Sequence, residues 1–485
     1  VIFFVLLLFL RPAVAELPQQ INTLFNGVRE YGYLWWMHGL RDERKVFAIQ
    51  TSRYAAAFDV PRLELTHLQL PEHALSPADA MVQENAALFG PPNASLVCTL
   101  HAGGSSYRAV GASRDPADCH LVESGRFFQR RQVNGIVWEE GAPELGGSLE
   151  VAAWPDRLTL LLRVAPVQAL KNAVIELQLG AGDGFHATVD PPQATLVNEP
   201  GQNRWTARRV VDDWPAGSEE TLALIVLATP EPEPAVEVTA RQIAPTATPA
   251  PVSYDRAFGW HRIGLRNDGN TAGYAETSND RIERVALSID NPAPTARTVR
   301  LCFAKGLPGK GGVFGITGLS AILRDKEGHP LGIPVQISKN WHTRELGRYL
   351  GPWYRGLTML SVPPETTIEL EYTSVNALWG GVPAASHAQL CLVGWGSNQL
   401  WEQAAVGSWG ESICFEPDQG QRGGAVLDTR PLMVHGLGKA PKRKWGWTCN
   451  VGGADFLVYY DAAGNKQWNS RMRTRHRRLG PVLTE

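Results

Sequence analysis

Short runs of alternating apolar and polar residues, separated by turn-forming residues, constrain the fold of this chain more than any other feature. Clear examples lie at Ser148–Ala153, Arg157–Val164, Ala173–Leu179, Arg284–Ile289 and Thr366–Tyr372. Runs of this length that are rich in apolar and β-branched residues and bounded by Gly, Pro, Asn or Asp are typical of β-strands. Long amphipathic helical patterns are nearly absent. The sequence therefore predicts an all-β protein.

Turn-forming residues indicate the kind of β architecture. The chain has 48 Gly and 34 Pro among its 485 residues, spread along its length, which favours antiparallel β-sandwiches. Leu323–Ser338 has two apolar runs around a turn that contains Gly and Pro, and we expect it to form a hairpin.

A Pro-rich stretch divides the pattern near the middle of the chain. Residues 244–253 have the extended character of a linker, and Val236–Ile243 before them alternates like a last strand of the first domain. We therefore expect two or more antiparallel β-sandwiches: an N-terminal domain over 16–243 and a Trp-rich, truncated C-terminal domain over 254–485. The alternative is a proline-studded loop inside one large two-sheet unit.

The N-terminus predicts export. Val1–Leu10 is apolar and leads to Ala13-Val14-Ala15, the pattern of a signal peptide over residues 1–15 that is cleaved before Glu16. The alternative is a membrane anchor, but a bilayer span needs about 20 apolar residues. We expect a secreted, periplasmic or cell-surface protein with no membrane span after cleavage. Because an initiator Met is lacking, we expect its true start to lie upstream.

Charge, cysteines and motifs exclude several classes of protein. A formal net charge of −2 gives no overall field for nucleic acid. None of the six cysteines lies in a C-x-x-C pair, which argues against a zinc ribbon. G-x-S-x-G, H-E-x-x-H and phosphate-loop motifs are missing as well. We expect no metal and no cofactor, and the oligomeric state stays open. Cys98–Cys119 is the easiest disulfide to imagine; reduced buried thiols are the alternative.

A segment rich in tryptophan and acids points to sugar chemistry. Trp379, Trp401 and Trp409 lie in one stretch with several carboxylates. Indole rings suit the C–H faces of a sugar, while carboxylates take hydrogen bonds from its hydroxyls. The same density could also fill a hydrophobic core.

Four acids are candidates for catalysis: Glu411, Glu416, Asp418 and Asp455. Glycosidic cleavage needs two carboxyl groups about 5–10 Å apart. We expect a strand over Glu411–Phe415 to end there because Pro417 cannot donate to a central ladder. The acids that follow would then lie at a sheet rim. The alternative is that they are solvated acids at strand ends.

A second aromatic segment supplies candidate binding residues. It contains Trp341, His342, Trp353, Tyr354 and Arg355. Arginine can grip a uronate carboxylate, and Tyr or His can remove the proton alpha to it. The alternative is a packed loop with arginine stacked on tryptophan.

The remaining candidate is a histidine. His387 precedes an apolar run and reads either as a hydrogen-bonded packing residue or as a base. Two runs near the C-terminus are basic, Lys439–Lys444 and Arg471–Arg478. They form either solvated faces or a surface that attracts an acidic polysaccharide.

In style, the second half resembles the mutarotase-like and related β-sandwich domains of secreted bacterial polysaccharide-degrading proteins. The resemblance rests on Trp341–Arg355, on Trp379-Gly380-Gly381 and on Trp409–Asp418. It implies a carbohydrate-facing sandwich and assigns no residue a role. The sequence thus predicts a secreted polysaccharide-active protein, a glycoside hydrolase. A uronate-specific polysaccharide lyase and a non-catalytic carbohydrate-binding or cell-surface module are the alternatives.

Overall fold

In the computed structural model, the described part of the chain contains strands and no helix, which confirms the predicted fold class. The structure describes residues 22–27, 45–51, 53–59, 62–70, 92–113, 119–123, 128–199, 203–228, 236–244, 247–265, 282–305, 318–329, 331, 333, 335–339, 344–345, 348–349, 354–377, 388–394, 401–408, 411–415, 426–435, 444–447 and 458–468. Within these ranges no helix is able to span a membrane. The predicted signal peptide lies outside them.

The described residues of the first half form three sheets. The first outer sheet has the order β14 (Thr195–Glu199), β15 (Arg204–Trp214), β12 (Leu170–Gly180), β5 (Ser95–Ala102), β6 (Ser105–Ala112), β9 (Ile136–Trp138). The first inner sheet has the order β13 (His186–Asp190), β16 (Glu220–Leu227), β11 (Arg157–Pro166), β10 (Leu145–Trp154), β8 (Gln129–Asn134), β7 (Cys119–Glu123). The N-terminal sheet has the order β1 (Asn22–Gly27), β2 (Lys45–Gln50), β3 (Ala55–Asp59), β4 (Glu64–Gln69).

In the second half, the described residues form two large sheets and two small hairpins. The second inner sheet has the order β19 (Val252–Asp255), β20 (Trp260–Gly264), β22 (Arg297–Lys305), β27 (Tyr354–Val362), β24 (Gln336–Lys339). The second outer sheet has the order β18 (Thr248–Pro249), β17 (Glu237–Ala244), β21 (Ile282–Asn291), β28 (Thr366–Ala377), β23 (Gly318–Asp325), β29 (Ala388–Gly394), β30 (Trp401–Ser408), β31 (Glu411–Phe415), β32 (Val426–His435), β33 (Lys444–Trp447). The small hairpins are β25 (Arg344–Glu345) with β26 (Arg348–Tyr349), and β34 (Val458–Tyr460) with β35 (Lys466–Trp468). The five strand predictions fall within β10, β11, β12, β21 and β28.

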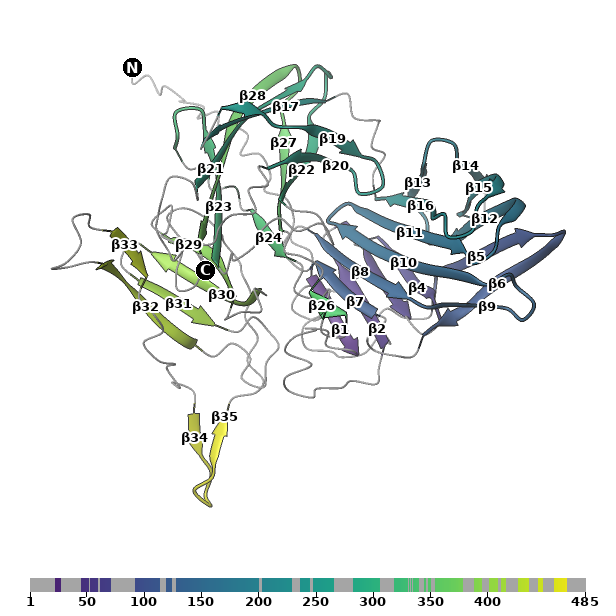
Figure 1. Cartoon of the computed structure of the whole chain (residues 1–485), viewed down its shortest axis with the longest axis horizontal. Helices are drawn as coiled ribbons and strands as arrows, with labels where there is room; N and C mark the ends of the chain where they lie inside the picture. The colour runs from purple at the N-terminus through teal and green to yellow at the C-terminus, as the bar shows by residue number, and fades with distance from the viewer. Residues whose placement is uncertain are drawn as a thin grey trace, which may run out of the picture.

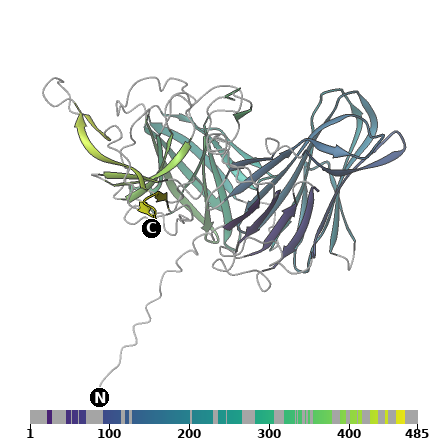
Figure 2. The ribbon, with the colours of Figure 1, turned by 90° about the horizontal axis from the view of Figure 1, so that it is seen from below.

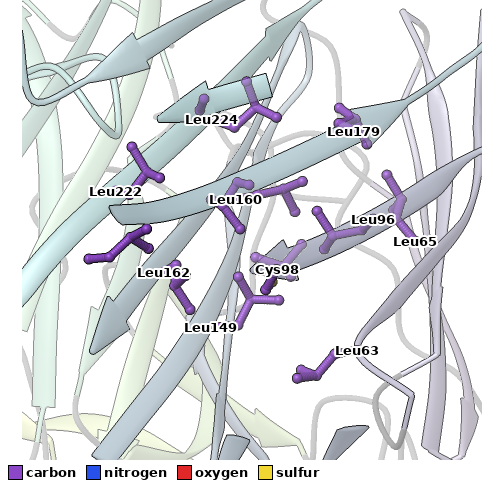
Figure 3. Close-up of a cluster of buried hydrophobic side chains, with 14 of the residues drawn as sticks. Leu63, Leu65, Leu96, Cys98, Leu149, Leu160, Leu162, Leu179, Leu222 and Leu224 are labelled. Atoms are coloured by element: carbon purple, nitrogen blue, oxygen red, sulfur yellow. The ribbon is translucent and has the colours of Figure 1, made fainter. Parts of the chain in front are cut away.

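The first sandwich has its core between the first outer and first inner sheets. Strand β5 alternates between buried and half-buried residues, as expected of a strand with one face on a core and the other toward water. Its buried residues Leu96 and Cys98 meet Leu149 of β10 and Leu160 of β11 in one cluster (Figure 3). Leu63 and Leu65 join that cluster, so the N-terminal sheet packs on the same core (Figure 2).

The inner sheets are buried on both faces, and the sequence explains why. Strand β16 reads ETLALIVL, a continuous apolar run, because its residues alternate between two cores instead of between core and water. Leu222 and Leu224 face the first core, whereas Ala223 and Ile225 face a second cluster shared with the other sandwich. The two sandwiches therefore pack against each other through their inner sheets (Figure 1).

An aromatic layer joins the sandwiches, and we define it as Phe128, Trp154, Phe258 and Trp260. Its rings lie 4.9 to 6.2 Å apart between centroids. The indole N–H of Trp154 donates to the Phe258 carbonyl at 2.9 Å, which satisfies a buried donor. Large aromatic faces buried between two sheets dominate the energetics of such a contact.

Sheet pairing changes the expected division of the chain. Strand β17 pairs with β21, so the segment that we expected to end the first sandwich belongs to the second outer sheet. It also pairs with β18 at Arg241 and Pro249. The described residues 247–253 include β18 of the second outer sheet and the start of β19 of the second inner sheet, so they lie within the second sandwich. Alternation revealed the strand but not its partner.

The hairpin predicted over Leu323–Ser338 was wrong. The turn does close locally, because the Leu331 N–H donates to the Leu323 carbonyl at 3.0 Å. However, β23 pairs with β28 and β29, while β24 pairs with β27 in the other sheet. The segment thus crosses from one sheet of the sandwich to the other. A turn signal predicts a reversal but does not show whether the next strand stays in the same sheet.

The suggested Cys98–Cys119 disulfide was also wrong. Cys98 is a free, buried thiol in β5 of the first outer sheet, whereas Cys119 lies in β7 of the first inner sheet. Burial raises the pKa of Cys98 to about 12. Cys98 therefore serves as a small core residue, which was the alternative.

Candidate functional site

Several strands of the second sandwich end at the same level, which we call the loop end. In the second inner sheet, Tyr354 pairs with both Lys305 and Lys339. In the second outer sheet, Gly318 pairs with both Ala377 and Val393. Segments 306–317 and 340–353 therefore leave and return at these strand ends, whereas 378–387 leaves there after Ala377 and rejoins at Ala388, opposite Ser408 at the far end of β29.

Ring stacking aligns the two sheets, so their loop ends lie on the same side. The Tyr372 ring of β28 stacks on the Phe303 ring of β22 with centroids 3.8 Å apart and planes at 11°. Phe303 lies two residues before Lys305. At the opposite end, Asn291 donates to the Val362 carbonyl at 3.2 Å. Both ends of 306–317 and of 340–353, and the start of 378–387, therefore lie at one end of the sandwich.

The β30–β31 hairpin separates two groups of candidate residues. Trp401 pairs with Gly394, and Phe415 pairs with Ala404, so this end of the hairpin lies toward the loop end. Ser408 and Glu411 lie at the other end of the hairpin. Strand β31 ends at Phe415, as predicted from Pro417.

The predicted site residues fall mostly outside the described part of the chain. Those outside it are Trp341, His342, Trp353, Trp379, His387, Trp409, Glu416, Asp418 and Asp455. Tyr354, Trp401 and Glu411 are the first residues of β27, β30 and β31. The roles assigned to these residues stay predictions.

Among the predicted site residues that the structure describes, Arg355 has a defined side-chain contact. Its guanidinium carbon lies 5.8 Å from the centroid of the Trp260 ring, at the edge of the aromatic layer. The side chain is half-buried. Of the two interpretations of the Trp341–Arg355 segment, arginine stacked on tryptophan is the one observed for Arg355.

Polar residues that sequence reasoning missed lie in the core below the loop end. Glu283, Tyr372 and Ser374 are at most 1% exposed, and Glu283 pairs across the strands with Ser374. Burial, followed by the Glu283 charge, raises the pKa of the Tyr372 hydroxyl. Glu283 shares the strand face of Val285 and Leu287, so an acid at an inward position was the available signal. These groups are closed to solvent, so they belong to the core and not to a surface site.

The described residues offer no ready metal site. No group of three or more His, Cys, Asp or Glu side chains that could hold a metal gathers among them.

Comparisons with known proteins identify no family. No family model matches the chain, and no curated protein matches it. Solved structures that align with it include a protein assigned as an aldose 1-epimerase from Escherichia coli K12, with 8% identity, 68% of this chain and 98% of that chain covered, and a TM-score of 0.18. A galactose mutarotase related enzyme from Lactobacillus acidophilus has 7% identity, coverage of 68% and 96%, and a TM-score of 0.17. A galactose mutarotase-like protein from Lactobacillus casei has 10% identity, coverage of 68% and 99%, and a TM-score of 0.17. Similarity this low carries no information about a site.

Proposed function

We propose that this protein binds carbohydrate at the loop end of its second sandwich and acts there as a glycoside hydrolase. One observation carries the proposal: the strand ends that flank the aromatic segments converge. Trp341, Trp353 and Trp379 each lie within two residues of a loop-end strand terminus. Several indoles at one rim suit the faces of a sugar.

The register of β30 and β31 sharpens the choice of catalytic acids. Glu416 directly follows Phe415 at the end of β31 that lies toward the loop end, near the start of β30 at Trp401. Glu411 begins β31 at the other end. At roughly 3.3 Å per residue, Glu411 and Phe415 lie about 13 Å apart along the strand. We therefore propose Glu416, with Asp418 or Asp455, as the carboxyl pair, and we leave Glu411 and Trp409 out of it.

The test measures new reducing ends on a panel of neutral and acidic polysaccharides. Glu416→Gln should abolish turnover and retain glycan binding, whereas the matched variant Glu411→Gln should keep full activity. Trp401→Ala should weaken glycan binding in affinity electrophoresis, and Trp409→Ala should not. Equal effects within either pair of variants would contradict the proposed site.

Other products would identify the alternatives. Unsaturated uronates that absorb in the ultraviolet would indicate a lyase that depends on Tyr354, His342 or Arg355. Glycan binding without any new ends would indicate a non-catalytic module.

We also propose that the protein is exported. The support is the apolar run Val1–Leu10 followed by Ala13-Val14-Ala15. N-terminal sequencing of protein recovered outside the cytoplasm should find Glu16 first. Recovery only in the cytoplasm, with residues 1–15 retained, would contradict this proposal.

A further inference from the structure

The open face of the first outer sheet carries a serine, a histidine and a glutamate in contact. Ser106 Oγ lies 2.7 Å from His101 Nδ1. On the other side of the ring, His101 Nε2 lies 3.0 Å from Glu176 Oε2. The second carboxylate oxygen of Glu176 lies 3.3 Å from Nε of Arg208. We propose that this cluster is a second, esterolytic site with Ser106 as its nucleophile.

Local sequence builds the serine–histidine pair. Gly103 and Gly104 both have positive φ, 59° and 81°, which is the backbone of a two-residue type I′ hairpin. That turn places His101 of β5 directly opposite Ser106 of β6. Cross-strand partners on one face of an antiparallel pair lie close enough for their side chains to touch. The two groups are therefore held on a rigid hairpin.

Neighbouring strands bring in the charged partners. Glu176 of β12 pairs with Thr99 of β5 on one side and with Arg208 of β15 on the other. It therefore sits diagonally from His101 and beside the arginine. Arg208 balances the carboxylate charge and holds one of its oxygens, which leaves the other for the imidazole.

Electrostatics fix the direction of proton transfer. A bare Nε2 lone pair 3.0 Å from a carboxylate would be repelled, so Nε2 carries the imidazole proton. Nδ1 is then an acceptor, and the Ser106 hydroxyl donates to it. In the resting geometry the Nε2–H is not aligned with Oε2, so that contact is electrostatic. The polarity nonetheless suits a serine whose proton is removed by a general base.

The chemistry balances with water as the only co-substrate. Ser106 Oγ attacks the carbonyl carbon of an ester while its proton passes to His101 Nδ1. The bond from the acyl carbon to the alcohol oxygen breaks, and that oxygen takes the proton from Nδ1. Water then attacks the acyl carbon and gives one proton to Nδ1. The acyl–Oγ bond breaks, Oγ regains the proton, and the carboxylic acid leaves.

Accessibility sets the substrate class. Ser106 is exposed, and Arg108, exposed as well, lies two residues along β6 on the same strand face. Arg108 supplies positive charge for the oxyanion that forms on the carbonyl oxygen. The site has no part in the proposed sugar site of the second sandwich. It suits small acyl esters, such as acetyl groups, presented on a larger molecule.

The experiment uses the whole chain with a fluorophosphonate probe and 4-nitrophenyl acetate. We expect one adduct, mapped by mass spectrometry to Ser106, and a burst of nitrophenol. Ser106→Ala should abolish both, whereas the matched variant Ser105→Ala should retain both. His101→Gln should lower the rate by about 10²-fold or more. His329→Gln should not lower it, although His329 also contacts a carboxylate, Asp325, at 3.1 Å.

Glu176 is a positioning residue, and its test separates that role from a structural one. Glu176→Gln should lower kcat about tenfold or more with KM unchanged, and Glu176→Asp should restore part of kcat. Thermal melts of each variant check folding. No adduct on the folded wild-type protein, or an equal adduct in Ser106→Ala, would overturn the proposal whether or not the chain degrades polysaccharide.

Discussion

Gly356 of β27 lies where the Tyr372 side chain of the facing sheet approaches closely. A Cβ at this position would lie 2.9 Å from the Tyr372 hydroxyl oxygen and 3.2 Å from Val335 Cγ1. Gly356→Ala should therefore lower the free energy of unfolding by about 1–3 kcal/mol, measured by denaturant titration. Gly146→Ala is the matched control, since its nearest neighbour would be 3.8 Å away. Equal stability of the two variants would contradict the close approach of Tyr372 and Val335 to Gly356. Tyr372→Phe should relieve part of the cost in the double variant.

His261 should make stability depend on pH in mildly acidic solution. Burial lowers its pKa from 6.5 to about 4. Between these values the unfolded chain binds more protons than the folded protein, so stability rises with pH from 4 to 6.5 and is lost on acidification. After allowance for partial solvent contact, we expect the titration of His261 to change the free energy of unfolding by about 1–2 kcal/mol across this pH window. Unfolding titrations of His261→Gln should show a shallower slope in this window and no change above pH 7. An unchanged slope between pH 4 and 6.5 would contradict the burial of this ring.

Cys98 should be chemically silent until the protein unfolds. Its pKa of about 12 leaves almost no thiolate at pH 8, and its side chain is 2% exposed. Iodoacetamide should therefore leave Cys98 unmodified in the native protein and modify it in denaturant, as read by peptide mass spectrometry. A peptide that joins Cys98 to another cysteine without reductant would contradict this prediction.

At the scale of elements, strands were easier to predict than their partners. Alternation located β10, β11 and β12 because local burial sets a period of two. Pairing depends on contacts far apart in the sequence. For this reason β17 was expected in the first sandwich, and β24 was expected to pair with the strand before it. Some long-range information was present. The unbroken apolar run of β16 indicates burial on both faces, which requires a second sheet on its far side.

Part of the proposed Ser106 site could also be predicted from the sequence. Two glycines between β5 and β6 predict a two-residue hairpin and so place His101 opposite Ser106. Glu176 could not be predicted to join them, because β12 becomes the neighbour of β5 only through the order of the finished sheet.

The contact between the turn after β10 and strand β22 should be a strong element-level link. Asp156 Oδ2 accepts from Arg300 at 2.8 Å, and the Arg300 side chain is 2% exposed. Asp156→Leu would leave a buried guanidinium without this carboxylate and should cost about 2–4 kcal/mol of unfolding free energy. Asp156→Leu with Arg300→Met should recover most of that loss. Glu199→Gln, at an exposed pair with Arg204, should change stability by less than about 1 kcal/mol. A cost for Asp156→Leu no larger than this control would contradict the buried pair.

At the scale of the molecule, the aromatic layer should make the two sandwiches unfold as one. Sandwiches that are connected only by a linker unfold separately, whereas a shared apolar core couples their unfolding. Here Trp154 of the first sandwich and Trp260 of the second are 1% and 3% exposed within the same cluster. Calorimetry of the whole chain should therefore show one main transition. Trp260→Ala removes a ring that contacts the other three rings of the layer and should split the transition into two. Val210→Ala, on the open face of the first outer sheet, should leave a single transition. Two transitions in the unaltered protein would mean that the layer does not couple the unfolding of the two sandwiches.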